Sequence, residues 1–409
     1  MRAIKFILIG ILALMALAAG AQPDSLRLQY SVSGRVSDAR SGKAIQAANI
    51  QVLGRNHATV SNADGGFVIR SDSPIRELVF SCLGYKTLQL RVGEGEVKAR
   101  LAPEKYLLDA SSITTGDPEE ILRSAILSVP DNYSRRPELL RCFYRETLQK
   151  RGRYIAVSEA VARIWKSAYP SPVWADKAAL EKSRIIMSQR RRDTLSVRLQ
   201  GGPTLSITAD AVKNQDMFFY DVEHKMYRYE MGNPEYLDGR LQFVIRFFPV
   251  TSAPYALCSG TVHVDQETLA FSRIEIHTDM SEPEKVIPQL LVRRPLGLRF
   301  TPRELSFVMS YRPTENGHYR MEYFRSTIRF DCDWKKRMFA TSYTLVNESV
   351  VTDVVQPAAA IPREEQFKTS DALSDKALEF QDPAFWEGYN IIAPSESLEH
   401  AVGRLRKNQ

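Results

Sequence analysis

The stretch from Tyr30 to Pro103 constrains the fold more than any other part of the sequence. Short runs in which apolar and polar residues alternate are separated there by clusters of Gly, Asn and Asp. Alternation with a period of two gives a strand one face of each kind. Asp64-Gly65 is the strongest hairpin signal, because Asp-Gly accepts the positive φ of a tight turn. The pattern predicts about seven short strands in a small β-sandwich.

Four motifs within this stretch also occur together in a known family. The sequence reads SGRVSD from Ser33, SGKAIQAANIQVLG from Ser41, ATVSNADGGFVI from Ala58 and ELVFSCLGYKT from Glu77. This order closely resembles the carboxypeptidase-regulatory-like domain, an Ig-like or prealbumin-like β-sandwich abundant in cell-envelope proteins of the Bacteroidetes type. The resemblance covers residues 30–103, and it implies a non-catalytic binding or spacing module.

The N-terminus has the pattern of a signal peptide over residues 1–21. Arg2 and Lys5 precede an apolar run over 6–18, and the small residues 19–21 then form a cleavage site. The run is short for a membrane span, which needs about 20 residues. We therefore expect an exported protein in the periplasm or on the periplasmic face of the outer membrane, with no transmembrane span after signal removal. An uncleaved N-terminal anchor is the alternative.

The charge of the chain argues against a nucleic-acid partner. The formal net charge is +7, and two of the positive charges lie in the expected signal peptide. The densest basic run, 190–192, is followed directly by Asp193. Nucleic-acid binding instead requires basic residues gathered on one face.

The four cysteines are Cys82, Cys142, Cys258 and Cys332, and none forms a CxxC pair. An oxidising compartment permits disulfides, so a bridge among the last three stays open. We favour free, buried thiols, because Cys82 and Cys332 lie in strand-like apolar runs where a small thiol fits.

The chain after the sandwich reads as mainly β. A linker is expected over 104–116 and a β-rich domain over 117–394. A helix over 118–129 opens that domain, with Asp117 as its N-cap. Long strand-like runs with few helices follow, and they predict one large, twisted antiparallel sheet or an open half-barrel.

Three segments depart from this strand pattern. Residues 168–215 are irregular and contain a charged, helix-like run over 177–192, so we interpret them as a possible insertion or lid. The aromatic stretch 382–389 is expected to be buried against the body. Residues 395–409 form a C-terminal helix or tail, whose apolar side we expect to dock on the body as well.

Two further resemblances concern the β-rich domain. Residues 142–166 and 364–394 are similar to a Bacteroidetes family in which the regulatory-like domain precedes a β-rich domain of unassigned function. Residues 258–277 resemble a hairpin of the outer-membrane lipoprotein-carrier fold.

One constellation suggests a metal site, namely His263, Asp265, Glu275 and His277. All four lie on one face of a predicted hairpin, and two imidazoles with two carboxylates suit a metal. The expected register places Arg273 opposite His263, however, and a fixed cation there disfavours a divalent ion. We therefore interpret the four as a solvated face with cross-strand charge pairs, and assign no metal ligand.

No residue is assigned to catalysis or to a cofactor. The sequence contains no GxSxG, HExxH or Gly-rich phosphate loop, and nothing pairs Cys142 with a histidine. We expect a non-enzymatic cell-envelope protein that binds an envelope protein or another ligand. The alternative is a lipid or lipoprotein carrier with a hydrophobic ligand in the half-barrel. A hydrolase with its site under residues 168–215 is the third reading.

The tyrosines and phenylalanines of the β-rich domain are the candidates for lining such a ligand cavity. Ordinary sheet core explains the same residues, and that reading stays open beside it. The residues are Phe218, Phe219, Tyr220, Tyr227, Tyr229, Phe247, Phe248, Tyr319, Tyr323 and Phe324.

Overall fold

The structure is a computed structural model of the 409-residue chain. It describes residues 29–104, 116–190, 193, 195, 197–199, 201–215, 226–335, 339–369, 371–376, 385–386, 389 and 391–406. The expected signal peptide and most of the expected linker lie outside these residues.

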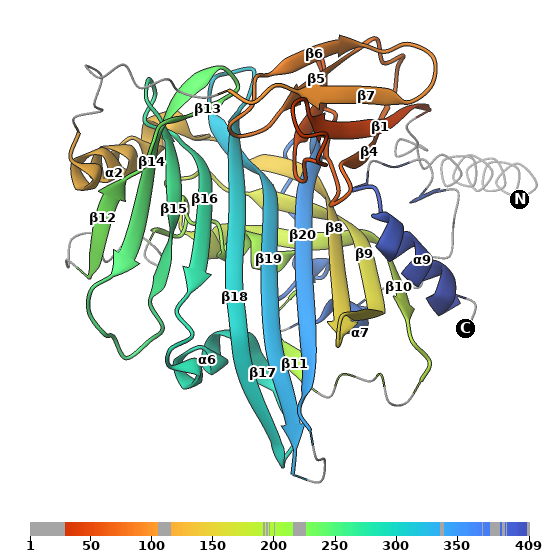
Figure 1. Ribbon diagram of the computed structural model, residues 1–409, viewed down its shortest axis with the longest axis vertical. Helices are drawn as coiled ribbons and strands as arrows, with labels where there is room; N and C mark the ends of the chain where they lie inside the picture. The colour runs from red at the N-terminus through yellow and green to blue at the C-terminus, as the bar shows by residue number, and fades with distance from the viewer. Residues whose placement is uncertain are drawn as a thin grey trace, which may run out of the picture.

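The N-terminal part is a seven-stranded β-sandwich, as the alternation predicts (Figure 1). One sheet has the order β4-β1-β7 and the other the order β3-β2-β5-β6. Alternate residues of both sheets, Val36, Ile50, Phe67 and Phe80 among them, form the core between them. The strands are Tyr30–Asp38 (β1), Asn49–Val52 (β2), Ala58–Val60 (β3), Gly66–Ser71 (β4), Glu77–Ser81 (β5), Leu88–Arg91 (β6) and Val97–Leu101 (β7).

The turn predicted at Asp64-Gly65 forms between β3 and β4. Gly65 has a φ of +77°, and a Cβ atom there would lie 2.3 Å from the carbonyl oxygen of Val36. Only glycine fits both requirements, because other residues rarely adopt that φ and all carry a Cβ.

The second part is built on one antiparallel sheet of twelve strands. The order is β12-β14-β15-β16-β18-β19-β20-β8-β9-β10-β21, with β13 paired to β14, and the sheet is not closed over the described residues. The strands are Glu138–Lys150 (β8), Arg153–Lys166 (β9), Lys177–Met187 (β10), Tyr227–Met231 (β12), Glu235–Leu237 (β13), Arg240–Pro249 (β14), Cys258–Asp265 (β15), Phe271–Thr278 (β16), Leu298–Pro313 (β18), Tyr319–Trp334 (β19), Thr341–Val355 (β20) and Gln366–Phe367 (β21).

The helix-like reading of residues 177–192 is wrong over most of its length. Residues 177–187 form β10, which pairs with β9 in the large sheet. The charges of this run suggested a helix surface, but Ala178, Ala179 and Ser183 are buried in the sheet, and tertiary packing overrides that local preference.

The remaining elements are short. They are α2 (Pro118–Leu127), α3 (Val129–Asn132), η1 (Val173–Ala175), β11 (Arg198–Leu199), α4 (Thr204–Thr208), η4 (Pro283–Lys285), α6 (Ile287–Leu290), β17 (Leu291–Arg293), α7 (Leu373–Lys376) and α9 (Glu396–Arg406). The predicted helix after the linker is α2, and the Asp117 carboxylate caps it by accepting a hydrogen bond of 3.0 Å from the Glu119 backbone N–H.

Each face of the large sheet has its own cover. The inner face carries Phe307, Phe324 and Phe330, and it is covered by α2, α3, α6 and the segment 195–212. The outer face carries Phe143 and Val161, and the sandwich and the C-terminal segment pack there.

The C-terminal segment 385–396 contacts both parts of the chain. Phe385 and Trp386 are buried against the outer face, as the aromatic stretch predicts. The side chains of Thr59, Asn62 and Arg70 in the sandwich donate hydrogen bonds to the carbonyl oxygens of Ile391 (3.2 Å), Pro394 (2.9 Å) and Tyr389 (2.8 Å). Helix α9 then docks its apolar side on β9 and β10, again as expected.

Candidate functional site

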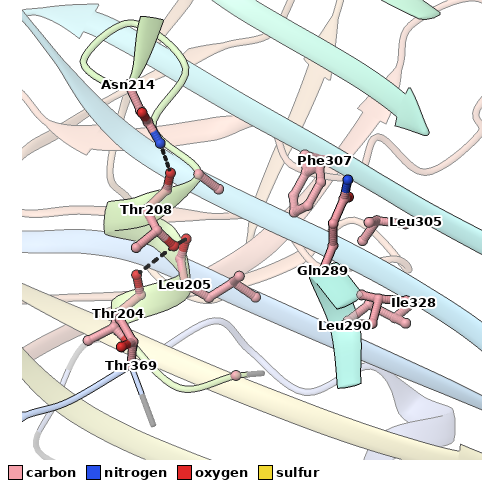
Figure 2. A pocket seen from close by; sticks show the side chains of 12 residues that line it. Thr204, Leu205, Thr208, Asn214, Gln289, Leu290, Leu305, Phe307, Ile328 and Thr369 are labelled. Carbon is pink, nitrogen blue, oxygen red and sulfur yellow. Dashed lines mark hydrogen bonds between the residues drawn. The ribbon is translucent and has the colours of Figure 1, made fainter. Parts of the chain in front are cut away.

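A cavity of about 240 Å³ lies between α4, α6 and the inner face of the large sheet (Figure 2). Its floor is formed by β18 and β19, where Leu305 and Ile328 lie opposite each other in the strand register. The cavity is lined by Gly201, Thr204, Leu205, Thr208, Ala209, Asn214, Gln289, Leu290, Leu305, Phe307, Ile328 and Thr369.

The local sequence places α4 over this floor. The chain enters α4 through Gly201-Gly202-Pro203, and Gly202 has a φ of +81°. A Cβ atom on Gly202 would lie 2.5 Å from the Phe367 ring, so the turn requires glycine. The five residues of α4 then divide between two sites, with Leu205 facing the cavity and Ile207 packing against Leu140 and Cys142 on the other side.

Two of the five polar side chains that line the cavity donate hydrogen bonds to the backbone around it. The Thr208 hydroxyl donates to the Thr204 carbonyl oxygen at 3.2 Å. The Asn214 amide donates to the Thr208 carbonyl oxygen at 2.7 Å. These bonds hold α4 and the following turn together, and they leave the apolar side chains as the main surface offered to a ligand.

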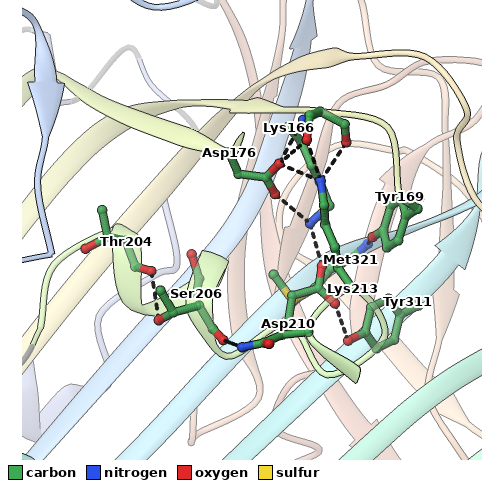
Figure 3. Close-up of polar contacts among 12 residues, drawn as sticks. Lys166, Tyr169, Asp176, Thr204, Ser206, Asp210, Lys213, Tyr311 and Met321 are labelled. Atoms are coloured by element: carbon green, nitrogen blue, oxygen red, sulfur yellow. Dashed lines mark hydrogen bonds and ion pairs between the residues drawn. The ribbon is translucent and has the colours of Figure 1, made fainter. Parts of the chain in front are cut away.

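A buried cluster of two lysines and two aspartates lies behind α4 (Figure 3). The ammonium group of Lys213 lies 2.5 Å from an Asp176 carboxylate oxygen. Lys166 donates to Asp210, and the Tyr311 hydroxyl donates to the same aspartate at 2.8 Å. The two positive charges of the lysines balance the two negative charges of the aspartates. Buried ionised groups require such pairing.

The two lysines of this cluster experience different electrostatic environments. Burial opposes the charge of Lys166, but the carboxylates of Asp210 and Asp176 outweigh it and raise the lysine's pKa. Burial and the neighbouring charge of Lys166 lower the pKa of Lys213, against the attraction of Asp176. The cluster joins β9, η1 and the segment after α4, so it fixes the cavity wall in place.

A carboxyl group adjoins the cavity at Gly201. Glu146 is half-buried on β8 and accepts a hydrogen bond of 3.0 Å from the Tyr144 hydroxyl. The backbone N–H of Gly202 donates to that same hydroxyl at 3.0 Å. Burial raises the pKa of Glu146 against these hydrogen bonds. The Tyr144 hydroxyl thus connects the carboxyl group of Glu146 to the turn that precedes α4.

The constellation on β15 and β16 is only partly as expected. His263 lies opposite Arg273, as the hairpin register predicts. The solvated face is wrong for His263 and Asp265, which are 4% and 1% exposed. The carboxylate of Glu235, on β13, lies 3.5 Å from Nε2 of His263.

Asp265 serves the turn rather than a ligand. One carboxylate oxygen accepts the backbone N–H groups of Glu267 (3.0 Å) and Thr268 (2.9 Å), and the other lies 3.3 Å from Arg240. Glu275 pairs with its strand neighbour Arg273 at 2.6 Å. No group of three or more His, Cys, Asp or Glu side chains suited to a metal is found among the described residues.

All four cysteines are free thiols in the structure. Cys142 and Cys332 are buried, and Cys82 and Cys258 are half-buried. Burial raises the pKa of Cys142 to about 12, with Ser349 and two distant cations opposing the shift. A thiol held in its neutral form is a poor nucleophile.

Most of the aromatic residues proposed for a cavity do not line one, although Tyr323 and Phe324 line a second, smaller cavity of about 20 Å³. Tyr227, Phe247, Tyr319 and Phe324 all lie in the inner-face core, and none of them lines the 240 Å³ cavity. Phe218, Phe219 and Tyr220 lie outside the described residues. The residues that do line the cavity come from segments as far apart as 201 and 369, and no local motif marks them.

No helix among the described residues is both long and apolar enough to cross a bilayer.

Residues 32–112 match the family model of the CarboxypepD_reg-like domain. This match spans the sandwich and confirms the resemblance seen in its motifs. No curated protein matches the chain.

Three solved structures are similar over more than half of the chain. A DUF1329 family protein from Desulfovibrio piger is 11% identical and covers 58% of this chain and 94% of its own, with a TM-score of 0.24. A LolA superfamily protein from Nitrosomonas europaea is 13% identical over 60% and 97%, with a TM-score of 0.21. MucB, solved in complex with MucA, is 10% identical over 59% and 96%, with a TM-score of 0.17. Sequence identities and TM-scores this low support no conclusion about function.

Proposed function

We propose that this protein is a non-enzymatic component of the cell envelope that binds a hydrophobic ligand between α4, α6 and the inner face of the large sheet. The observation that carries the proposal is the apolar cavity of about 240 Å³. Its floor and one wall are made by Leu290, Leu305, Phe307 and Ile328, all of them at least nine-tenths buried.

The size of the cavity limits the ligand. An engineered apolar cavity of about 150 Å³ binds benzene, and drug-sized pockets begin near about 300 Å³. A volume of about 240 Å³ suits one short alkyl chain or a small aromatic group. Gln289 and Thr369 stand at the cavity and suit the polar end of such a molecule (Figure 2).

The sandwich supports the envelope assignment. Its family model and the signal-like residues 1–21 favour an exported protein in the periplasm or on the periplasmic face of the outer membrane. The sandwich is packed firmly on the outer face of the sheet, so it acts as an accessory module joined to the ligand-binding part.

The test is native mass spectrometry of the exported protein, followed by titration with the fluorescent probe N-phenylnaphthylamine. We expect the mass of a small apolar molecule that co-purifies with the protein, and probe fluorescence that a short-chain fatty acid displaces. Leu205→Trp fills the cavity and should weaken probe binding about tenfold or more. Leu127→Trp is the matched control, because Leu127 is 73% exposed on α2.

The outcome against the proposal is a clean apo mass together with probe binding that Leu205→Trp leaves unchanged. A urea unfolding curve for each variant separates a filled cavity from an unfolded protein. The proposal that the protein is not an enzyme is checked by incubation with ester, peptide and phosphate substrates. Turnover above the rate in buffer alone would contradict it.

A further inference from the structure

One end of the large sheet carries exposed apolar and basic side chains together. This basic tip consists of Val292, Arg293, Arg294, Leu296, Arg299, Lys335 and Phe339. It comprises the residues leading into β18 and those on either side of the β19–β20 connection. The two connections lie side by side, because the backbone N–H of Lys335 contacts the Gly297 carbonyl oxygen at 3.4 Å.

The apolar side chains of the tip are unusually exposed. The exposed fractions are 101% for Leu296, 72% for Phe339 and 44% for Val292. Single exposed apolar residues are ordinary on protein surfaces. Here Leu296 and Phe339 both lie just outside the same end of the large sheet, and Val292 lies on β17, four residues before Leu296. The next residues along β18, Leu298 and Phe300, are buried in the core.

The charge around these side chains is mainly positive. Arg293, Arg294, Arg299 and Lys335 are all exposed. Asp333 lies opposite Arg299 in the strand register. Asp331 lies further from the end and is bonded to Arg303 at 2.7 Å.

We propose that the basic tip docks on the surface of an anionic phospholipid membrane. Leucine and phenylalanine side chains at this position enter the acyl boundary, while guanidinium groups hydrogen-bond lipid phosphates from the same end. Basic residues close to an anionic leaflet each add an attraction that falls off within a Debye length.

The tip is continuous with the cavity wall. Leu290 of α6 lines the cavity, and β17 follows it directly and carries Val292 and Arg293. The sandwich lies at the opposite end of the molecule from the tip (Figure 1). A protein docked by the tip therefore holds its cavity wall close to the lipid and presents its sandwich away from it.

This inference goes beyond the proposed ligand binding and is tested separately. The exported protein, whose mass shows that the apolar residues 6–18 are gone, is sedimented with vesicles of phosphatidylcholine alone or with about one-third phosphatidylglycerol. We expect binding to the anionic vesicles and weak binding to the neutral ones. Raising the salt from about 0.1 M to 1 M should release most of the protein, since screening then acts over about 3 Å.

Two pairs of variants identify the surface. Arg293→Glu with Arg294→Glu should lower vesicle binding at least about twenty-five-fold, from about fivefold for each of the two positive charges removed. Leu296→Ser with Phe339→Ser should lower it about tenfold or more. The matched controls are Lys98→Glu with Arg100→Glu on exposed positions of β7, and Leu127→Ser on α2.

Equal binding to both kinds of vesicle, no vesicle binding at all, or tip variants that bind like the unmodified protein would each overturn the inference. Probe binding in the cavity is measured on the same samples. Because the tip residues do not line the cavity, probe binding should survive in every tip variant.

Discussion

The ammonium nitrogen of Lys213 lies 2.5 Å from a carboxylate oxygen of Asp176, and neither side chain has exposed surface. A buried charge is tolerated when it is paired and becomes costly when its partner is removed. This pair links the segment after α4 to η1, so it holds a wall of the cavity against the sheet.

Replacing Lys213 with Met should therefore destabilise the protein by about 3–5 kcal/mol, because Asp176 loses its nearest cation and must share Lys166 with Asp210. The measurement is urea unfolding followed by tryptophan fluorescence. Combining Lys213→Met with Asp176→Asn should recover more than half of that loss, since Lys166 and Asp210 remain as a neutral pair. Losses that simply add in the double variant would contradict this account.

Glu146 should make the folded state less stable as pH rises. Its pKa is raised by burial in the folded protein. The folded state therefore binds the proton more tightly than the unfolded state, and this contribution is complete below the unfolded pKa and is lost as pH rises through the folded one. Glu146→Gln removes the titration. The difference in urea midpoint between Glu146→Gln and the unmodified protein should grow in favour of the variant as pH rises above about 4.5, near the ordinary glutamate value. A difference that is flat between pH 4 and 8 would refute it.

Trp386→Ala should cost about 3–5 kcal/mol, the usual range for a buried tryptophan. The Trp386 side chain lies between the Phe385 ring, at 5.2 Å, and the Arg184 guanidinium, at 4.5 Å. Trp174→Ala is the control, because that side chain is 75% exposed and its loss should stay within about 0.5 kcal/mol. Differential scanning calorimetry reports both values, and equal losses would argue against a stabilising role for segment 385–396.

Gly202→Ala and Gly152→Ala separate a steric clash from backbone strain. Both glycines have positive φ, +81° and +75°. The added methyl group meets the Phe367 ring only at Gly202, whereas Gly152 has open space around it. Gly152→Ala should cost about 1 kcal/mol and Gly202→Ala about 1–3 kcal/mol more. Thermal unfolding measures both, and only Gly202→Ala should also weaken probe binding in the cavity.

The sequence was informative wherever structure is set by neighbouring residues. The Asp64-Gly65 turn, the Asp117 cap and the pairing of His263 with Arg273 each depend on residues close in the chain. The charges of residues 177–187 predict a helix, but these residues form a strand, and its pairing with β9 decides which positions are buried. The buried ion pairs cannot be predicted from the sequence for a similar reason. Lys166 and Asp210 are 44 positions apart, and nothing local marks them as partners.

The residues that line the cavity are even harder to predict from the sequence. Leu205, Leu290 and Ile328 meet only because three distant segments converge on the inner face. Each of them alone reads as an ordinary core residue. Tyr227 and Phe247, which suit a cavity by residue type, instead pack on each other with their ring centroids 5.6 Å apart.

The position of segment 385–396 also sets an order on synthesis. The sandwich emerges first and can close its own core while the rest of the chain is being made. Its contact with the large sheet is completed by the carbonyl groups of Tyr389, Ile391 and Pro394, which emerge more than three hundred residues later. The sandwich therefore stays folded but incompletely docked until almost the whole chain has left the ribosome.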